Sequence, residues 1–320
     1  MSYKIFARAV SCAFAILFTA PALACSAHVC ELPSDWLSQG LAAHPNSTSV
    51  SLRYDFAPQT QLRLGTDAVD RATVSIPNPE EIEQSTYNHA LNITATHSFG
   101  ANWIAEVQVP LLLRPHRTIT ENETDISSSR TKGLGDVQAS LRFQGFGGRG
   151  VTGVELGLKL PTGQFHQTFQ TGPEAGNPVD RGLQPGSGTT DAILGIYHFG
   201  KLTGPIDFLV QAQVQVPLGG REGYQPGVSG MLSAGISYTR LRGITPQLQL
   251  NLRAAARDSG ANADVAKSGG EQLYVAPGLS ARLSGSTILF GIAQLPLYQR
   301  VNGYQIAPRY TLSLGVQHKF

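Results

Sequence analysis

The sequence predicts an all-β protein, a single transmembrane antiparallel up-and-down β-barrel of about twelve strands. Three observations predict it: an export signal at the N-terminus, repeated alternation of apolar and polar residues, and connections that alternate between short and long. A membrane-spanning strand needs about 9–11 residues, with lipid-facing apolar positions alternating with polar positions that face the lumen. Because hydrocarbon offers no partner to backbone N–H and C=O groups, such strands must close into a barrel.

The first 24 residues have the pattern of a cleavable signal peptide. Basic residues precede an apolar run, Ala9 to Ala20, and a small-residue cleavage site ends at Ala24. The run is shorter than the roughly 20 residues that a spanning helix needs. We therefore expect residues 1–24 to be a signal peptide, 25–46 a periplasmic segment, and 47–320 the outer-membrane barrel.

The alternation has a period of two along most of the remaining chain. In the first segment Leu52 and Tyr54 alternate with Arg53 and Asp55. Clean segments are found at 50–56, 91–96, 103–109, 136–143, 154–160, 207–216 and 247–254; less regular ones are 191–199, 231–240, 273–283, 287–297 and 308–320. An even number of strands is typical of single-chain bacterial barrels.

The predicted connections alternate in length. Short ones are 98–102, 144–150, 200–205, 241–245 and 284–286; the other set, 57–85, 114–132, 162–189, 218–228, 257–271 and 298–307, is mostly long. Short periplasmic turns and longer outer loops are typical of outer-membrane barrels. The run Gly145–Gly150 matches G-x-G-x-x-G, but period-two alternation follows it instead of the helix that a dinucleotide site requires. It is therefore interpreted as a hairpin turn.

Composition and the C-terminus narrow the function classes. Charged residues are 14% of the chain, against roughly 25% in soluble proteins, and a net charge of +2 without a basic stripe argues against nucleic acid. The terminal strand ends in Phe320, which resembles the signature read by the barrel assembly machinery. We expect the outer membrane of a Gram-negative bacterium, with its lipid and lipopolysaccharide as surroundings.

Two cysteines follow the predicted cleavage site. Cys25 and Cys30 are expected to form a disulfide, since exported cysteine pairs are oxidised in the periplasm. Lipidation of Cys25, or a soft-metal site with His28, remain alternatives. No metal or other cofactor is otherwise expected. No G-x-S-x-G elbow occurs, so an enzyme is not expected.

Charged residues on the polar face of the strands are the candidate functional residues. They are expected to line the lumen: Arg53, Asp55, Glu106, Asp136, Arg142, Glu155, Lys159, Asp207 and Arg253. Two readings stay open, a polar translocation path whose charges set selectivity and a salt-bridged plug of a narrow barrel. Either requires that the buried charges are paired.

Three motifs carry a family resemblance. The segments 133–136 (GLGD), 158–163 (LKLPTG) and 184–191 (QPGSGTTD) together resemble the MetA-pathway of phenol degradation family of outer-membrane proteins. The resemblance implies a barrel and uptake of small, aromatic or apolar compounds, and it carries no ligand residues. Gly133, Gly135, Pro161 and Gly163 are expected to form turns at strand ends, so their role is architectural.

The sequence thus favours a passive channel or transporter for small solutes, without a cofactor. Its lumen would be gated by the loops 162–189 and 57–85, with the segment 25–46 as a plug. A closed structural or adhesive barrel, whose outer loops bind partners, is the alternative. An outer-membrane hydrolase is a less favoured one.

Overall fold

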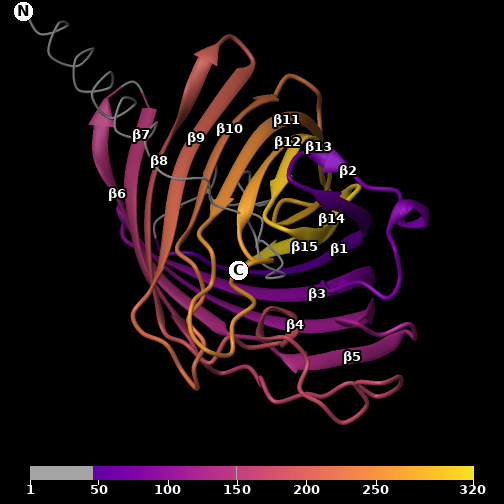
Figure 1. Ribbon diagram of the computed structural model, residues 1–320. Coiled ribbons are helices and arrows are strands. Elements are labelled where there is room, and N and C mark those ends of the chain that lie inside the picture. The colour runs from indigo at the N-terminus through magenta and orange to yellow at the C-terminus, as the bar shows by residue number, and fades with distance from the viewer. Residues whose placement is uncertain (1–45, 149) are drawn as a thin grey trace, which may run out of the picture.

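The computed structural model describes residues 46–148 and 150–320, which form one closed antiparallel barrel of twelve strands (Figure 1). Each strand pairs with the strands before and after it, and the first strand closes the barrel by pairing with the last. The predicted fold class and strand number are therefore confirmed. The strands are β1 (Thr48–Leu64), β3 (Ile82–Phe99), β4 (Trp103–Ile119), β6 (Val137–Gly148), β7 (Gly150–Leu160), β8 (Asp191–Thr203), β9 (Ile206–Pro217), β10 (Ser229–Tyr238), β11 (Ile244–Ala255), β12 (Gly270–Arg282), β13 (Thr287–Val301) and β15 (Thr311–Lys319).

Shorter elements extend the wall of the barrel. β5 (Ser127–Leu134) and β6 both pair with β4, and the wall is interrupted between them at Gly135 and Asp136. β14 (Tyr304–Pro308) precedes β15 in the same way, and β2 (Asp67–Ala68) pairs with β1. The 3₁₀ turns η1 (Arg71–Thr73) and η2 (Arg181–Leu183) lie in loops. None of the helices in the described part is long and apolar enough to cross a membrane.

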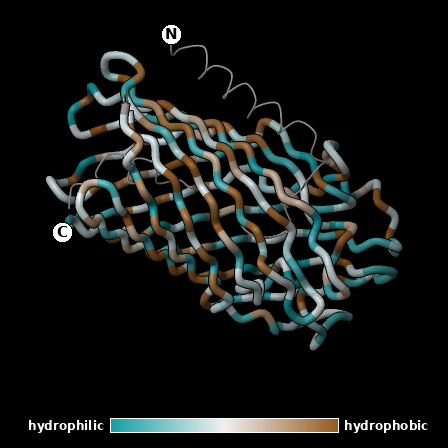
Figure 2. The backbone as a smooth tube through the Cα atoms, turned by 90° about the vertical axis from the view of Figure 1, so that its left-hand side faces the viewer, coloured by the Kyte–Doolittle hydropathy of each residue, from teal (hydrophilic) through white to brown (hydrophobic). Residues whose placement is uncertain are grey.

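The barrel is apolar outside and polar inside. Leu52 and Tyr54 are 43% and 41% exposed, whereas Arg53 and Asp55 between and beside them are 4% exposed. The same alternation runs along the tilted strands of Figure 2, where brown and teal segments follow one another. Water-soluble proteins bury apolar side chains, so this reversed arrangement fits a barrel surrounded by hydrocarbon.

The two ends of the barrel differ. One end, here the turn end, carries the tight turns after β3, β6, β8, β10 and β12, together with both ends of the barrel chain, since the Phe320 N–H donates to the Thr48 carbonyl. Gly148 pairs with Gly150 there, so the glycine-rich run belongs to the β6–β7 hairpin, although most of the predicted turn 144–150 is strand. The other end, here the loop end, carries the connections 65–81, 120–126, 161–190, 218–228 and 256–269.

Three of the predicted long loops were wrong in extent. All of 57–64 belongs to β1 and 82–85 to β3, and most of 114–132 belongs to β4 and β5. In 298–307 only residues 302–303 lie between the strands β13 and β14. These strands continue past the apolar belt, where neither face meets lipid and the period-two pattern fades. They are held by pairing with one another and by a small buried cluster of Leu62, Ile82 and Ile306.

Candidate functional site

Charged side chains inside the barrel are held in ion-paired clusters. Arg53 Nε lies 2.9 Å from Asp55 Oδ2. Arg142 is flanked by two carboxylates, with Nη2 3.0 Å from Glu106 Oε1 and Nε 3.6 Å from Glu155 Oε1. All five side chains are at most 15% exposed. Pairing of this kind offsets the cost of removing the charges from water.

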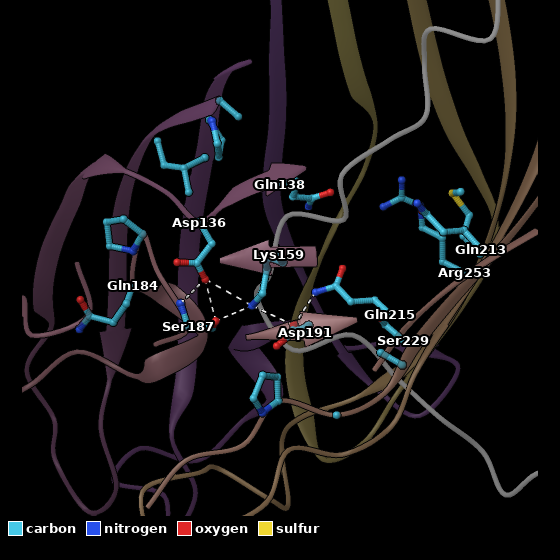
Figure 3. A pocket seen from close by; sticks show the side chains of 18 of the residues that line it. Asp136, Gln138, Lys159, Gln184, Ser187, Asp191, Gln213, Gln215, Ser229 and Arg253 are labelled. Carbon is cyan, nitrogen blue, oxygen red and sulfur yellow. Dashed lines mark hydrogen bonds and ion pairs between the residues drawn. The ribbon is translucent and has the colours of Figure 1, made fainter. Parts of the chain in front are cut away.

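A third cluster lies where the barrel wall is interrupted (Figure 3). Lys159 Nζ is 3.3 Å from Asp136 Oδ2 and 2.9 Å from Asp191 Oδ2. Asp136 also accepts hydrogen bonds from the Gly163 N–H at 3.0 Å, the Ser187 N–H at 2.8 Å and the Ser187 hydroxyl at 2.7 Å. One carboxylate therefore holds both ends of the long β7–β8 loop, and we call these five residues the loop clamp.

The three family-like motifs meet at the loop clamp. Asp136 comes from 133–136, Lys159 and Gly163 from 158–163, and Ser187 and Asp191 from 184–191. Two of their glycines touch, because a Cβ added to Gly163 would lie 2.6 Å from the Gly186 Cα. No larger residue fits at this contact without moving the backbone. The architectural role predicted for the motif glycines thus has a physical basis at Gly163.

The β7–β8 loop folds back over the inner wall at the loop end. Arg114 Nη1 donates to the Gln184 carbonyl at 2.9 Å, and the Thr131 hydroxyl donates to the Leu183 carbonyl at 2.7 Å. The Gln184 side chain is 2% exposed, accepts from the Gln167 N–H and donates to the carbonyls of Gln167 and Val179. These hydrogen bonds fix the loop against the wall of the barrel.

A second group of contacts joins this loop to its neighbours at the mouth. The Arg181 guanidinium lies 4.1 Å from the Phe165 ring centroid and 5.1 Å from that of Tyr224 in the β9–β10 loop. The Tyr224 hydroxyl donates to Asp258 of the β11–β12 loop at 3.0 Å. Burial, and then the Asp258 carboxylate, raise the pKa of Tyr224 well above its ordinary value. Three loops are thus fastened together.

Beneath these loops the barrel encloses a cavity of about 180 Å³ (Figure 3). One side is apolar and is formed by Ala90, Pro110, Leu112 and Pro185. The rest is mixed: its polar residues include Gln138, Lys159, Gln213, Gln215, Ser229 and Arg253, and its apolar residues include Met231, Ala254 and Ala255. Engineered cavities of about 150 Å³ admit benzene, so this space accommodates a molecule of about one ring.

The nine charged residues named from the sequence are distributed along the interior. Asp55, Asp136, Lys159 and Arg253 line the cavity. Arg53, Glu106, Arg142 and Glu155 belong to the ion-paired clusters, and Asp207 is half-buried near the turn end, where its Oδ1 has no hydrogen-bond partner. The structure therefore brings Asp136 and Lys159 together, and likewise Glu106, Arg142 and Glu155. It leaves Asp207 apart from both groups.

Several residues at the cavity were not among the candidates. Asp191 and the glutamines Gln213 and Gln215 have the same strand parity as their inward neighbours, so the alternation alone could have included them. Ser187 had no such signal, because it is a loop residue that contacts the wall only through the return of the chain.

Some predictions fall outside the described residues. The signal peptide, the Cys25–Cys30 disulfide with its alternatives, and nearly all of the proposed plug 25–46 lie there. Within the described ranges, no group of three or more His, Cys, Asp or Glu side chains is arranged to hold a metal ion. The lack of enzymatic activity stays a prediction.

Comparisons with known proteins support the fold. No protein-family model and no curated protein sequence matches the chain. Among solved structures it is similar to an outer-membrane channel from Pseudomonas putida F1, with a TM-score of 0.64, 14% identity, and coverage of 87% of this chain and 97% of that one. It is less similar to the β-domain of the Bordetella autotransporter BrkA (TM-score 0.48, 14% identity, 86% and 100% covered). The toluene transporter TbuX of Ralstonia pickettii gives a TM-score of 0.42 at 8% identity, with 88% and 91% covered.

At sequence identities of 8–14% the structural similarity establishes only the fold, and TM-scores below 0.5 support no further conclusion. The chain has the fold of outer-membrane β-barrels. Membership of the MetA-pathway of phenol degradation family is not shown by these comparisons and stays a prediction.

Proposed function

We propose that the protein is a passive outer-membrane channel for small solutes, with aromatic or apolar compounds of about one ring as the favoured class. The cavity of about 180 Å³ inside the barrel carries this proposal. Its apolar side at Pro110, Leu112 and Pro185 suits the body of such a solute, and its polar side suits a hydroxyl or similar group. No cofactor or chemical step is required.

The proposal includes the cellular setting. The signal peptide would direct export, and Phe320 would be read by the barrel assembly machinery. The apolar belt would then contact outer-membrane lipid, and lipopolysaccharide in the outer leaflet. In this orientation the turn end faces the periplasm and the loop end faces the medium, as in bacterial barrels generally. The β7–β8 loop would be the constriction through which solutes enter.

A closed barrel whose loops bind partners is the second candidate. The ion-paired clusters favour it, because Arg53 with Asp55 and Arg142 with its two glutamates fill part of the lumen with mutually satisfied charges. Its loops are also fastened to one another at Arg181 and Tyr224, which would give a partner a firm surface.

Single-channel recording of the refolded protein in planar bilayers distinguishes the open channel from the closed barrel. A channel gives discrete, steady openings that an unrelated plugged barrel, refolded in the same way, does not give. If the correctly folded protein produces no openings, the closed barrel replaces the channel as the better account.

A further inference from the structure

The interior of the barrel is divided into two chemically different walls. The wall of β1 to β8 carries the three ion-paired clusters. The wall of β9 to β13, on the orange-to-yellow side of Figure 1, carries nine carboxamides on its inward positions. These are Gln211, Gln213, Gln215, Gln247, Gln249, Asn251, Gln272, Gln294 and Gln299, with Asp207 toward the turn end and Arg253 beside the cavity.

The centre of this carboxamide wall is a ladder of uncharged polar residues on β10 and β11. The register pairs Ser233 with Asn251, Gly235 with Gln249, and Ser237 with Gln247. The five polar residues among them are 2–6% exposed. Together they form a continuous polar strip that leads from the cavity at Met231 and Arg253 toward the turn end.

Atoms of the ladder have unused hydrogen-bonding capacity. Ser233 Oγ, Ser237 Oγ, Gln247 Oε1, Gln249 Nε2 and Asn251 Oδ1 are buried without a hydrogen-bond partner. Buried polar atoms are nearly always paired in proteins, and leaving them unpaired costs free energy. On the opposite wall the carboxylates of Asp55, Glu106 and Asp136 have ionic partners, although other polar atoms there, such as Asn88 Oδ1 and the Tyr197 hydroxyl, are also buried without a hydrogen-bond partner.

The glycines beside the ladder hold its long side chains against the wall. A Cβ added to Gly235 would lie 2.9 Å from Gln249 Cγ, and one added to Gly278 would lie 2.5 Å from Gln247 Nε2. Both carboxamides therefore lie across the face of a neighbouring glycine. Larger residues at these two positions would push the carboxamides toward the axis of the barrel.

We infer that solutes cross the lumen along this ladder, whose buried side chains turn toward the axis to meet them, and that it favours uncharged solutes bearing a hydrogen-bonding group. A carboxamide both donates and accepts, so a hydroxyl or carbonyl group can bond to one rung and then to the next, about 7 Å further along the strand. An ion gains no counter-charge from the ladder, so the ladder favours such solutes while hydrated ions pass through the rest of the lumen. The inference rests on the proposed channel function and narrows its solute class.

The test replaces rungs by apolar residues of similar shape in the full-length protein. Asn251→Leu and Gln249→Met remove the hydrogen-bonding groups and keep the volume. Proteoliposome swelling with erythritol, an uncharged polyol, measures passage of the chosen class. The KCl conductance of the same samples measures the open pore. Leu250→Met, on the lipid-facing side between the two rungs, is the matched control, and heat-modifiable gel mobility reports folding of each variant.

We expect each rung variant to slow erythritol swelling about fivefold, the factor that corresponds to one lost hydrogen bond, and Leu250→Met to leave it unchanged. Wild-type swelling rates in the folded rung variants would overturn the inference. So would a wild-type protein that conducts KCl but excludes erythritol, and in that case the channel itself would stand. A folded wild type that passes neither would instead contradict the proposed channel function. If one of the two rung variants does not fold, the swelling rate of the other variant tests the inference.

Discussion

The carboxylate of Asp136 accepts two hydrogen bonds from Ser187, one from its backbone N–H at 2.8 Å and one from its hydroxyl at 2.7 Å. The two residues are separated by 51 positions, and the pair joins the interrupted wall between β5 and β6 to the return of the β7–β8 loop. Lys159 lies against the same carboxylate oxygen, so charge and hydrogen bonding act at one point. The position of the β7–β8 loop depends on this contact.

Removal of the Asp136 carboxylate should therefore release the loop. Asp136→Ala leaves Lys159 paired only with Asp191 and leaves Ser187 without its acceptor, so we expect a loss of about 3 kcal/mol in the free energy of unfolding. Asp136→Asn, which keeps an acceptor, should lose less. Urea unfolding in lipid vesicles measures both. Asp125→Ala, at an exposed loop position, is the control and should change stability by at most about 0.5 kcal/mol. Equal effects at the two sites would contradict the role of the clamp.

The contact between Gly163 and Gly186 predicts a steric effect. A Cβ on Gly186 would lie 2.4 Å from the Gly163 carbonyl oxygen, so Gly186→Ala must displace the loop and should cost about 1–3 kcal/mol. Gly219→Ala is a matched control, because no atom lies within 4 Å of a Cβ at that glycine. Thermal unfolding midpoints of the two variants give the comparison. A midpoint for Gly186→Ala equal to that of Gly219→Ala would show that the loop tolerates the displacement.

Arg142 should be essential for stability because it separates two glutamates. Arg142→Met leaves Glu106 and Glu155 buried without their counter-charge, and we expect a loss of about 3–5 kcal/mol. The triple variant that also carries Glu106→Gln and Glu155→Gln should recover most of that loss. Urea unfolding checks both, and a triple variant no more stable than Arg142→Met would mean that packing of the arginine, not charge, matters.

Tyr224 should resist ionisation in alkaline solution. Burial and Asp258 raise the pKa of Tyr224 in the folded protein. The neutral Tyr224 side chain therefore contributes fully to the stability of the folded state below the ordinary tyrosine pKa of about 10. This contribution is lost as the pH rises from about 10 toward the pKa of Tyr224 in the folded protein. The tyrosinate absorbance of wild type minus that of Tyr224→Phe should stay near zero through the range in which exposed tyrosines titrate. A difference that rises near pH 10 would show that Tyr224 is open to solvent.

The barrel could be predicted from local pattern because every strand repeats the same alternation. Leu52 and Arg53 already show which face meets lipid and which does not, without knowledge of the rest of the chain. The strand extensions at the loop end could not be predicted in this way, because the alternation is absent from them. The sequence of β5, SSSRTKGL, has no apolar face. The outer edge of β5 pairs with the β7–β8 loop, where Ser128 forms a bridge with Thr171.

The loop clamp and the ladder could be identified only from the tertiary structure. Ser187 and Asp136 lie in two of the three family-like motifs, but nothing local to Ser187 indicates that the chain returns to Asp136. Gln249 and Asn251 occupy polar positions of the alternating segment 247–254, but an uncharged side chain is not distinguished there by its charge. Whether a buried polar group has a partner depends on which strands become neighbours, and period-two alternation does not contain that information.

The measurement that tests passage through the cavity most directly is the conductance of a variant in which the cavity is filled. Met231 lines the cavity, whereas Leu232 next to it is exposed on the outer face, so Met231→Trp and Leu232→Trp place the same ring on opposite sides of the wall. We predict that Met231→Trp loses most of the wild-type conductance and that Leu232→Trp keeps it. Unchanged conductance in folded Met231→Trp would contradict a path through this cavity.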